Sequence, residues 1–150
     1  MTRMLANVDV DDLERGIAFY REGLGLRLGR RLFDGAVAEM LGGSMPIHLI
    51  AKKPGTPAVG RGPSRRDYGR HWTPIHFDFV VGDVERAVRN ACAAGAVLEE
   101  EARTYAWGRI VTLSDPFGHG FCVLELVGDG YDAVADGGGR DRKPAPASKP

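Results

Sequence analysis

Two histidines stand in apolar surroundings, and their side chains are the first candidates for chemistry. His48 lies within the run Pro46 to Ile50, and His76 lies within Pro74 to Phe77. An imidazole in such a place can bind a divalent ion or exchange a proton near neutral pH, so both residues are candidate catalytic groups. The alternative is a pair of half-buried histidines that hydrogen bond to neighbouring polar groups.

Aromatic and basic side chains form a second set of candidates. Trp72, Tyr105 and Trp107 could stack on a flat ligand, or they could pack in the core or at an interface. Four arginines between residues 61 and 70 could cover a site and attract an anionic substrate, or they could be solvated loop charge. These arginines are Arg61, Arg65, Arg66 and Arg70. His71 follows them directly.

An internal repeat must position these side chains. Residues Val10 to Arg15 return as Val81 to Arg86, 71 positions later, and the apolar positions of a helix return after them. Asp11, with Glu14 three residues on, is expected to begin the first helix, and Asp83 the second. Three apolar runs separated by turn residues follow each helix. The chain is therefore expected to be an α+β protein built from two strand–helix–strand–strand–strand units.

The strands of the second unit and the domain limits follow from composition. After the second helix, strands are expected at Ala96 to Leu98, Arg109 to Leu113 and Phe121 to Val127. The two units cover about residues 4–52 and 73–128, and a linker rich in Gly, Pro and Arg joins them over 53–72. We expect one domain over 1–130. Residues 131–150 show no periodicity and are expected to form a disordered tail.

Charge and cysteine content exclude several classes of protein. The chain of 150 residues carries 20 basic and 20 acidic side chains, which gives no electrostatic reason to expect nucleic acid or a membrane as a partner. No apolar run reaches the length of about 20 residues that spans a bilayer. Cys92 and Cys122 form no disulfide framework, and each is interpreted as a packed structural residue. We expect a cytoplasmic protein.

The order of the motifs is the strongest guide to the fold. Asp12-Leu13-Glu14-Arg15, with Phe19-Tyr20 and Leu24-Gly25-Leu26 after it, opens the first helix, and Trp107-Gly108, Asp115-Pro116-Phe117-Gly118 and Phe121 to Glu125 close the second unit. This order resembles the vicinal oxygen chelate superfamily of glyoxalases, bleomycin-resistance proteins and ring-cleaving dioxygenases. The resemblance covers roughly residues 4 to 128. It implies two βαβββ modules whose curved mixed sheets enclose a cleft.

The resemblance also implies where a metal would bind. Metal-using members ligate a divalent ion from the first and fourth strands of each module, and these positions fall on Leu5, His48, His76 and either Cys122 or Glu125. Leu5 cannot bind a metal. Cys122 and Glu125 point to opposite faces of a regular strand, so only one can face the cleft. With Glu125, the histidines would resemble a two-histidine, one-carboxylate site for Ni, Mn, Fe or Zn.

The missing ligand at Leu5 orders the functional hypotheses. We expect a glyoxalase-like or bleomycin-resistance-like protein that binds a small molecule in its cleft without a complete four-ligand metal site. The alternative is a divalent-metal-dependent lyase, isomerase or dioxygenase that acts on a small oxygenated substrate. A third hypothesis is a metal-free enzyme that uses His48 or His76 as a general base. The resemblance further implies a homodimer.

Overall fold

Two aspartates at equivalent repeat positions begin the two helices. Asp12 accepts a hydrogen bond from the backbone N–H three residues on, at 3.0 Å, and begins α1 (Leu13–Glu22). Asp83 does the same at 2.9 Å and begins α2 (Val84–Ala93). Such a side chain satisfies an N–H that has no partner inside the helix. The prediction of Asp83 is confirmed, whereas the prediction of Asp11 is wrong by one residue, because Asp12 holds the extended conformation of a cap.

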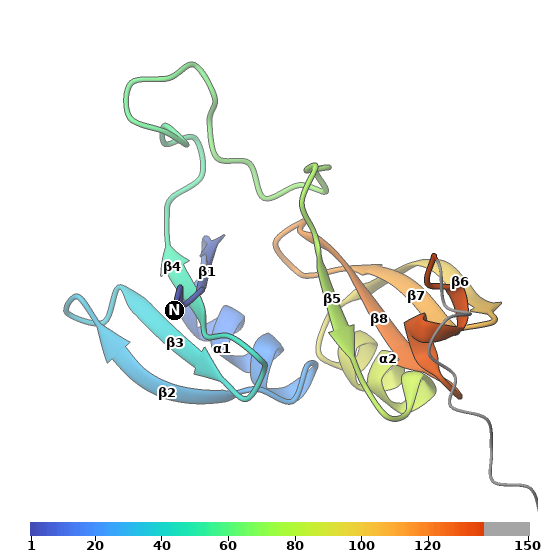
Figure 1. The fold of residues 1–150 in the computed structure, drawn as a ribbon. Helices are drawn as coiled ribbons and strands as arrows, with labels where there is room; N and C mark the ends of the chain where they lie inside the picture. The colour runs from blue at the N-terminus through green and yellow to red at the C-terminus, as the bar shows by residue number, and fades with distance from the viewer. Residues whose placement is uncertain (137–150) are drawn as a thin grey trace, which may run out of the picture.

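The computed structural model describes residues 1–136, in which each helix joins a four-stranded mixed sheet (Figure 1). The strand order is β1-β4-β3-β2 in the first module and β5-β8-β7-β6 in the second. The first module contains β1 (Ala6–Val10), β2 (Arg27–Leu32), β3 (Val37–Leu41) and β4 (Ile47–Ala51). The second contains β5 (Phe77–Val80), β6 (Val97–Tyr105), β7 (Gly108–Ser114) and β8 (Gly120–Leu126). The predicted α+β fold of two βαβββ modules is confirmed.

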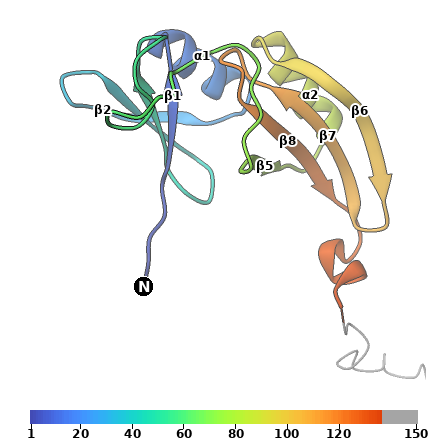
Figure 2. The ribbon, with the colours of Figure 1, turned by 90° about the horizontal axis from the view of Figure 1, so that it is seen from above.

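Strand β6 is much longer than the expected Ala96 to Leu98. It continues through a charged stretch to Tyr105, pairs only with β7 and is exposed along its whole length. Figure 2 shows β6 as the outer edge of a curved sheet. The length of such an edge strand depends on backbone pairing with its neighbour rather than on apolar residues, so hydrophobic alternation does not reveal it.

The two modules share one core. Helix α1 packs on β2, β3 and β4, and α2 packs on β6, β7 and β8. Phe19 of α1 reaches across to Phe121 of β8, with ring centroids 6.2 Å apart, and both side chains are buried. Burial of apolar surface from both modules therefore stabilises their association. The sheet face opposite each helix is called the open face below.

The segments outside the modules have their own structure. In Figure 1 the linker forms the long loop between β4 and β5. After β8, residues Gly130–Val134 form one short 3₁₀ helix, η1. The rest of the expected tail, from residue 137 on, lies outside the described residues. Within residues 1–136 no helix has the length and apolar character needed to cross a membrane.

Candidate functional site

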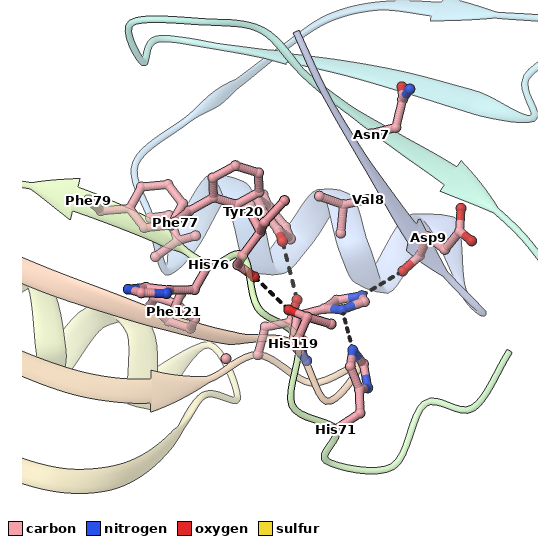
Figure 3. Close-up of a pocket in the computed structure, with 15 residues that line it drawn as sticks. Asn7, Val8, Asp9, Tyr20, His71, His76, Phe77, Phe79, His119 and Phe121 are labelled. Atoms are coloured by element: carbon pink, nitrogen blue, oxygen red, sulfur yellow. Dashed lines mark hydrogen bonds between the residues drawn. The ribbon is translucent and has the colours of Figure 1, made fainter. Parts of the chain in front are cut away.

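A cavity of about 510 Å³ lies between the two modules, beside the edge strands β1 and β5. Its lining is aromatic at one end and polar at the other. Figure 3 shows Tyr20, Phe77, Phe79 and Phe121 at the aromatic end. The polar end contains Asp9, His71, Asp115 and His119. A cavity of this size, with an apolar wall and a few convergent polar groups, has the character of a small-molecule site.

Ring contacts hold the aromatic end in place. Phe79 and Phe121 meet edge to face, with centroids 5.7 Å apart and planes at 89°. Phe121 in turn contacts Phe19 in the shared core, and Phe19 contacts Tyr20 at 5.4 Å. Edge-to-face packing of this kind is favourable beyond the area it buries. The aromatic wall is therefore built before any ligand arrives.

A buried carboxylate supports the polar end. Asp115 is only 4% exposed and accepts hydrogen bonds from the backbone N–H groups of Phe117 at 2.8 Å and His119 at 2.9 Å. The Tyr20 hydroxyl donates to its other oxygen at 3.2 Å. Burial raises the pKa of Asp115, and the nearby His119 works against that rise. Burial, with the adjacent Asp115, also raises the pKa of Tyr20, so its hydroxyl stays a donor.

Two histidines from distant parts of the chain meet at the cavity wall. His71 Nε2 lies 2.9 Å from His119 Nδ1, and the rings are nearly perpendicular. His119 Nε2 lies 2.8 Å from the backbone oxygen of Asp9 in β1 (Figure 3). His71 Nδ1 lies 2.9 Å from the backbone oxygen of Gly69. The pair therefore joins the linker, the β7–β8 turn and the first module.

Among residues 1–136, one group of three potential metal ligands lies within 4.8 Å, and it consists of His76, Asp78 and Cys122. His76 Nε2 is 3.3 Å from Asp78 Oδ1. Asp78 pairs with Cys122 across the parallel strands β5 and β8, so both point to the open face of the second module. Burial raises the pKa of the Cys122 thiol, which favours the neutral form. Asp78 is the residue that sequence reasoning missed, although it follows His76 by two positions, the spacing that returns a strand to the same face.

His48 lies in a different place from His76. It faces the open face of the first module, where its Nε2 is 3.4 Å from Glu39 Oε1. Arg30 donates to the same carboxylate at 2.9 Å. The hydrogen bond from Arg30, with a smaller contribution from His48, lowers the pKa of Glu39. His48 does not line the cavity between the modules, and its partner is a carboxylate within its own sheet.

Glu125 lies on the helix side of β8. Its Oε2 accepts a hydrogen bond from the backbone N–H of Val84 at 3.0 Å, at the start of α2. Cys122 lies on the other face of the same strand, as the alternation of side chains requires. The three residues considered as a metal site, His48, His76 and Glu125, therefore have separate partners. Leu5 precedes β1 and is exposed.

The three aromatic candidates also separate. Tyr105 and Trp107 stack face to face, with centroids 5.3 Å apart and planes at 3°, and Trp107 contacts Tyr131 at 5.0 Å. This stack sits at the β6–β7 hairpin and does not line the cavity between the modules. Trp72 is 79% exposed and lines a smaller hollow of about 320 Å³ beside Cys122.

Two of the four linker arginines fix the linker to the modules. The guanidinium of Arg66 bonds the Asp9 carboxylate at 2.6 Å and also donates to backbone oxygens of the linker. Arg70 pairs with Glu99 of β6 and donates to the backbone oxygen of His71. Hydrogen bonds between charged groups are roughly twice as strong as those between neutral ones. These two guanidinium groups therefore fix the linker and are not free to bind an anionic ligand.

Comparison with known proteins gives the family. The model of the glyoxalase-like domain matches residues 6–124, which span both modules and the linker. The chain belongs to the glyoxalase-like domain family. The predicted membership of the vicinal oxygen chelate superfamily is thereby confirmed.

Individual relatives of this glyoxalase-like chain differ in length and in sequence. The anthracycline biosynthesis protein DauV of Streptomyces sp. strain C5 is 34% identical in an alignment of 132 residues, which covers 85% of this chain and 42% of that protein. The chain thus spans less than half of this curated relative. TioX of Micromonospora sp. ML1 has a TM-score of 0.63 at 18% identity, over 85% of this chain and all of its own. The fosfomycin resistance protein FosX of Listeria monocytogenes also has a TM-score of 0.63, at 16% identity over 83% of this chain and 93% of its own. These two structures establish likeness of fold.

Proposed function

We propose that this protein binds a planar aromatic small molecule that carries oxygen substituents, in the cavity between its two modules. One observation carries the proposal: the cavity of about 510 Å³ combines a fixed aromatic wall with a polar end. A flat ring system can lie against Phe77 and Phe121, while hydroxyl or keto oxygens reach the polar side chains. The relative named for anthracycline biosynthesis supports this class of ligand, because anthracyclines are planar, polycyclic and rich in oxygen.

The proposal is tested by thermal-shift titration of the tag-free chain with an anthracycline, and with a small oxo-acid for comparison. Ligand at a hundred times its Kd stabilises a protein by about 2.7 kcal/mol. For a chain of this length that corresponds to a rise in Tm of about 5–10 °C. The oxo-acid cannot cover the aromatic wall and should therefore give little rise in Tm. The absence of a shift with any planar aromatic compound would refute the proposal.

Two variants locate the bound ligand. Phe77→Ala removes part of the aromatic wall and should weaken binding by about tenfold. Trp107→Ala removes an aromatic side chain from the stack at the β6–β7 hairpin, outside the cavity. It is the matched control and should bind normally. If Trp107→Ala loses binding and Phe77→Ala does not, the ligand stacks at the hairpin instead. That result would support the sequence-based hypothesis that Tyr105 and Trp107 bind the ligand.

The second candidate function is metal-dependent catalysis, and the group of His76, Asp78 and Cys122 favours it. Their nitrogen, oxygen and sulfur donors fit an ion of the zinc type, and three protein ligands leave a position free for substrate or water. When bound, such an ion supplies Lewis-acid stabilisation of developing negative charge on oxygen. His76 and Asp78 would bind the ion in place of their mutual contact, and the Cys122 thiol would have to give up its proton to bind.

Metal analysis of protein purified without a histidine tag tests this candidate. A stoichiometric Zn, Ni, Mn or Fe content that is lost in Cys122→Ser and kept in Cys92→Ser would establish the site. Cys92 is the matched control because it is exposed on α2, away from the group. Equal metal content in the unmodified chain, Cys122→Ser and Cys92→Ser would reject this metal site.

We also propose that the protein is a homodimer. Large apolar side chains remain exposed on and beside β5, among them Trp72 at 79%, Ile75 at 76% and Val80 at 61%. A concentration of apolar surface of this kind marks an interaction site. Light scattering after gel filtration should give twice the mass of the chain, and the monomer mass at micromolar concentration would contradict the proposal.

A further inference from the structure

The contact between His71 and His119 has an unusual chemical requirement. Four ring nitrogens stand in a row between two backbone oxygens, those of Gly69 and Asp9, and are linked by three hydrogen bonds of 2.8 to 2.9 Å. A carbonyl oxygen only accepts hydrogen bonds, so the nitrogen that faces each oxygen must carry a proton. The middle contact joins two nitrogens and needs one proton between them.

The number of protons then fixes the charge. Three hydrogen bonds require three N–H protons, and two neutral imidazoles carry only two. A neutral pair would therefore leave either a nitrogen lone pair pointing at a carbonyl oxygen or two lone pairs pointing at each other. One imidazole together with one imidazolium satisfies all three contacts.

We propose that His71 and His119 form a proton-dependent clamp, in which one additional proton holds the linker and the β7–β8 turn against β1 at the polar end of the cavity. Loss of that proton breaks one of the three contacts and loosens the polar wall. The clamp does not depend on the identity of the ligand, nor on whether a metal binds on the open face of the second module.

Backbone packing beside the clamp shows that these segments are pressed together. The backbone N–H of His71 donates to the oxygen of Gly118 at 3.2 Å. A Cβ atom on Gly118 would overlap the carbonyl group of Gly69. The two rings therefore close a contact that the backbone already makes, and their hydrogen bond to Asp9 extends it to the first module.

Charged groups from β1, the linker and the β7–β8 turn surround the clamp. From β1, the Asp9 carboxylate is paired with Arg66. From the linker, Arg70 is paired with Glu99. The turn supplies Asp115, which accepts from the backbone N–H of His119 and can balance an imidazolium there. The charge of Asp115 also acts on Arg70 and raises the pKa of that guanidinium. The linker adds Asp67, which accepts from the backbone N–H of Gly69 at 2.9 Å.

Two further titratable groups complete the surroundings. Tyr20 of α1 donates its proton to Asp115 and stays neutral, because burial raises the pKa of its hydroxyl. His76 lines the aromatic end of the cavity and contacts Asp78 instead of the clamp. The proximity of His119 works against the effect of burial on the pKa of Asp115.

The first test counts the protons directly. Nitrogen-15 NMR of the full chain, labelled in histidine and free of a histidine tag, is recorded over about pH 5 to 8.5, the range around the ordinary histidine value of about 6.5. Assignment uses single histidine variants. On the acid side of the transition, three of the four ring nitrogens of the pair should be protonated. The fourth should carry no proton, or the two nitrogens of the middle contact should give an averaged signal because they share one proton. Two neutral imidazoles at every pH in this range would overturn the proposal.

The second test follows the contact itself by hydrogen exchange. The protection of the His71 amide, corrected for the intrinsic pH dependence of exchange, should fall by about ten- to a hundredfold when the proton leaves, as for the loss of a hydrogen bond to a charged group. His119→Gln removes the titrating ring and should abolish this pH dependence. His48→Gln is the matched control, because His48 lies on the other sheet face and should leave it intact. If the protection of the His71 amide does not depend on pH in the unmodified chain, the clamp is contradicted. It is also contradicted if the pH dependence stays unchanged in His119→Gln.

Discussion

Replacement of Gly118 by alanine tests whether the linker is fixed to the β7–β8 turn. Gly118 has a φ of +82°, and a Cβ built there would lie 2.6 Å from the carbonyl carbon of Gly69. The substitution therefore combines backbone strain with displacement of the linker. Gly35 has a φ of +85° and no atom within 4 Å of a built Cβ, so Gly35→Ala measures the strain alone.

The expected losses differ several-fold. Alanine in the left-handed region costs about 1–2 kcal/mol, of which the stiffer unfolded chain offsets about 0.4–1 kcal/mol. Gly35→Ala should therefore lower the free energy of unfolding by about 1 kcal/mol. At Gly118 an overpacked contact adds about 1–3 kcal/mol. Loss of the bond from the His71 amide to Gly118, now 3.2 Å, adds about 0.5–1.5 kcal/mol.

Urea unfolding and thermal unfolding, both followed by circular dichroism, measure the free energy of unfolding and the Tm of the two variants. The sum for Gly118→Ala is a loss of about 3–5 kcal/mol. At about 2–4 °C per kcal/mol, Tm should fall by about 10 °C for Gly118→Ala and by about 3 °C for Gly35→Ala. Equal losses in the two variants would show that the linker yields without cost, and the argument for a fixed linker would fail.

Three further substitutions probe the polar contacts. Because burial raises the pKa of Asp115 in the folded state, its carboxyl adds stability below its unfolded pKa of about 3.9 that is lost as the pH rises through the folded value. The stability of the unmodified chain relative to Asp115→Asn should therefore fall as the pH rises above about 4. A rise in this relative stability in urea titrations would contradict the prediction. Glu125→Ala removes the acceptor at the start of α2 and should cost about 1 kcal/mol, whereas an unchanged Tm would show that the contact is dispensable. Arg66→Lys keeps a positive charge beside the Asp9 carboxylate, but a lysine cannot also bond the backbone oxygens of the linker. Trypsin should therefore cut after Arg61 or Arg65 several-fold faster. An unchanged cleavage rate would mean that the charge alone holds the linker.

The repeat made the fold predictable, because its information is local. Apolar periodicity and aspartate caps recur 71 residues apart, and each copy must bury its helix against its own strands. The exact cap at Asp12 and the length of β6 were not predictable in the same way. The first depends on which of two adjacent aspartates takes the extended conformation, and the second depends on pairing with β7.

The candidate site was only partly predictable, because it depends on contacts between distant segments. Strand alternation correctly places Cys122 and Glu125 on opposite faces, but the faces are decided by the parallel pairing of β5 with β8. His71 and His119 are 48 residues apart, in a linker and a turn, where no periodicity exists to relate them. Tyr20 fits the apolar spacing of its helix, and nothing local reveals its bond to Asp115.

The anchored linker also sets a mechanical limit on the two modules. Arg66 is held on β1 by Asp9, and His71 is held on the β7–β8 turn. The covalent path between these two points is five Cα-to-Cα steps, which reach at most about 18 Å when fully extended. While both attachments hold, the modules therefore move as if joined by a short tether rather than by the full loop from β4 to β5. Widening of the cavity is bounded by that tether, and a ligand too thick for it can enter only after one attachment has been released.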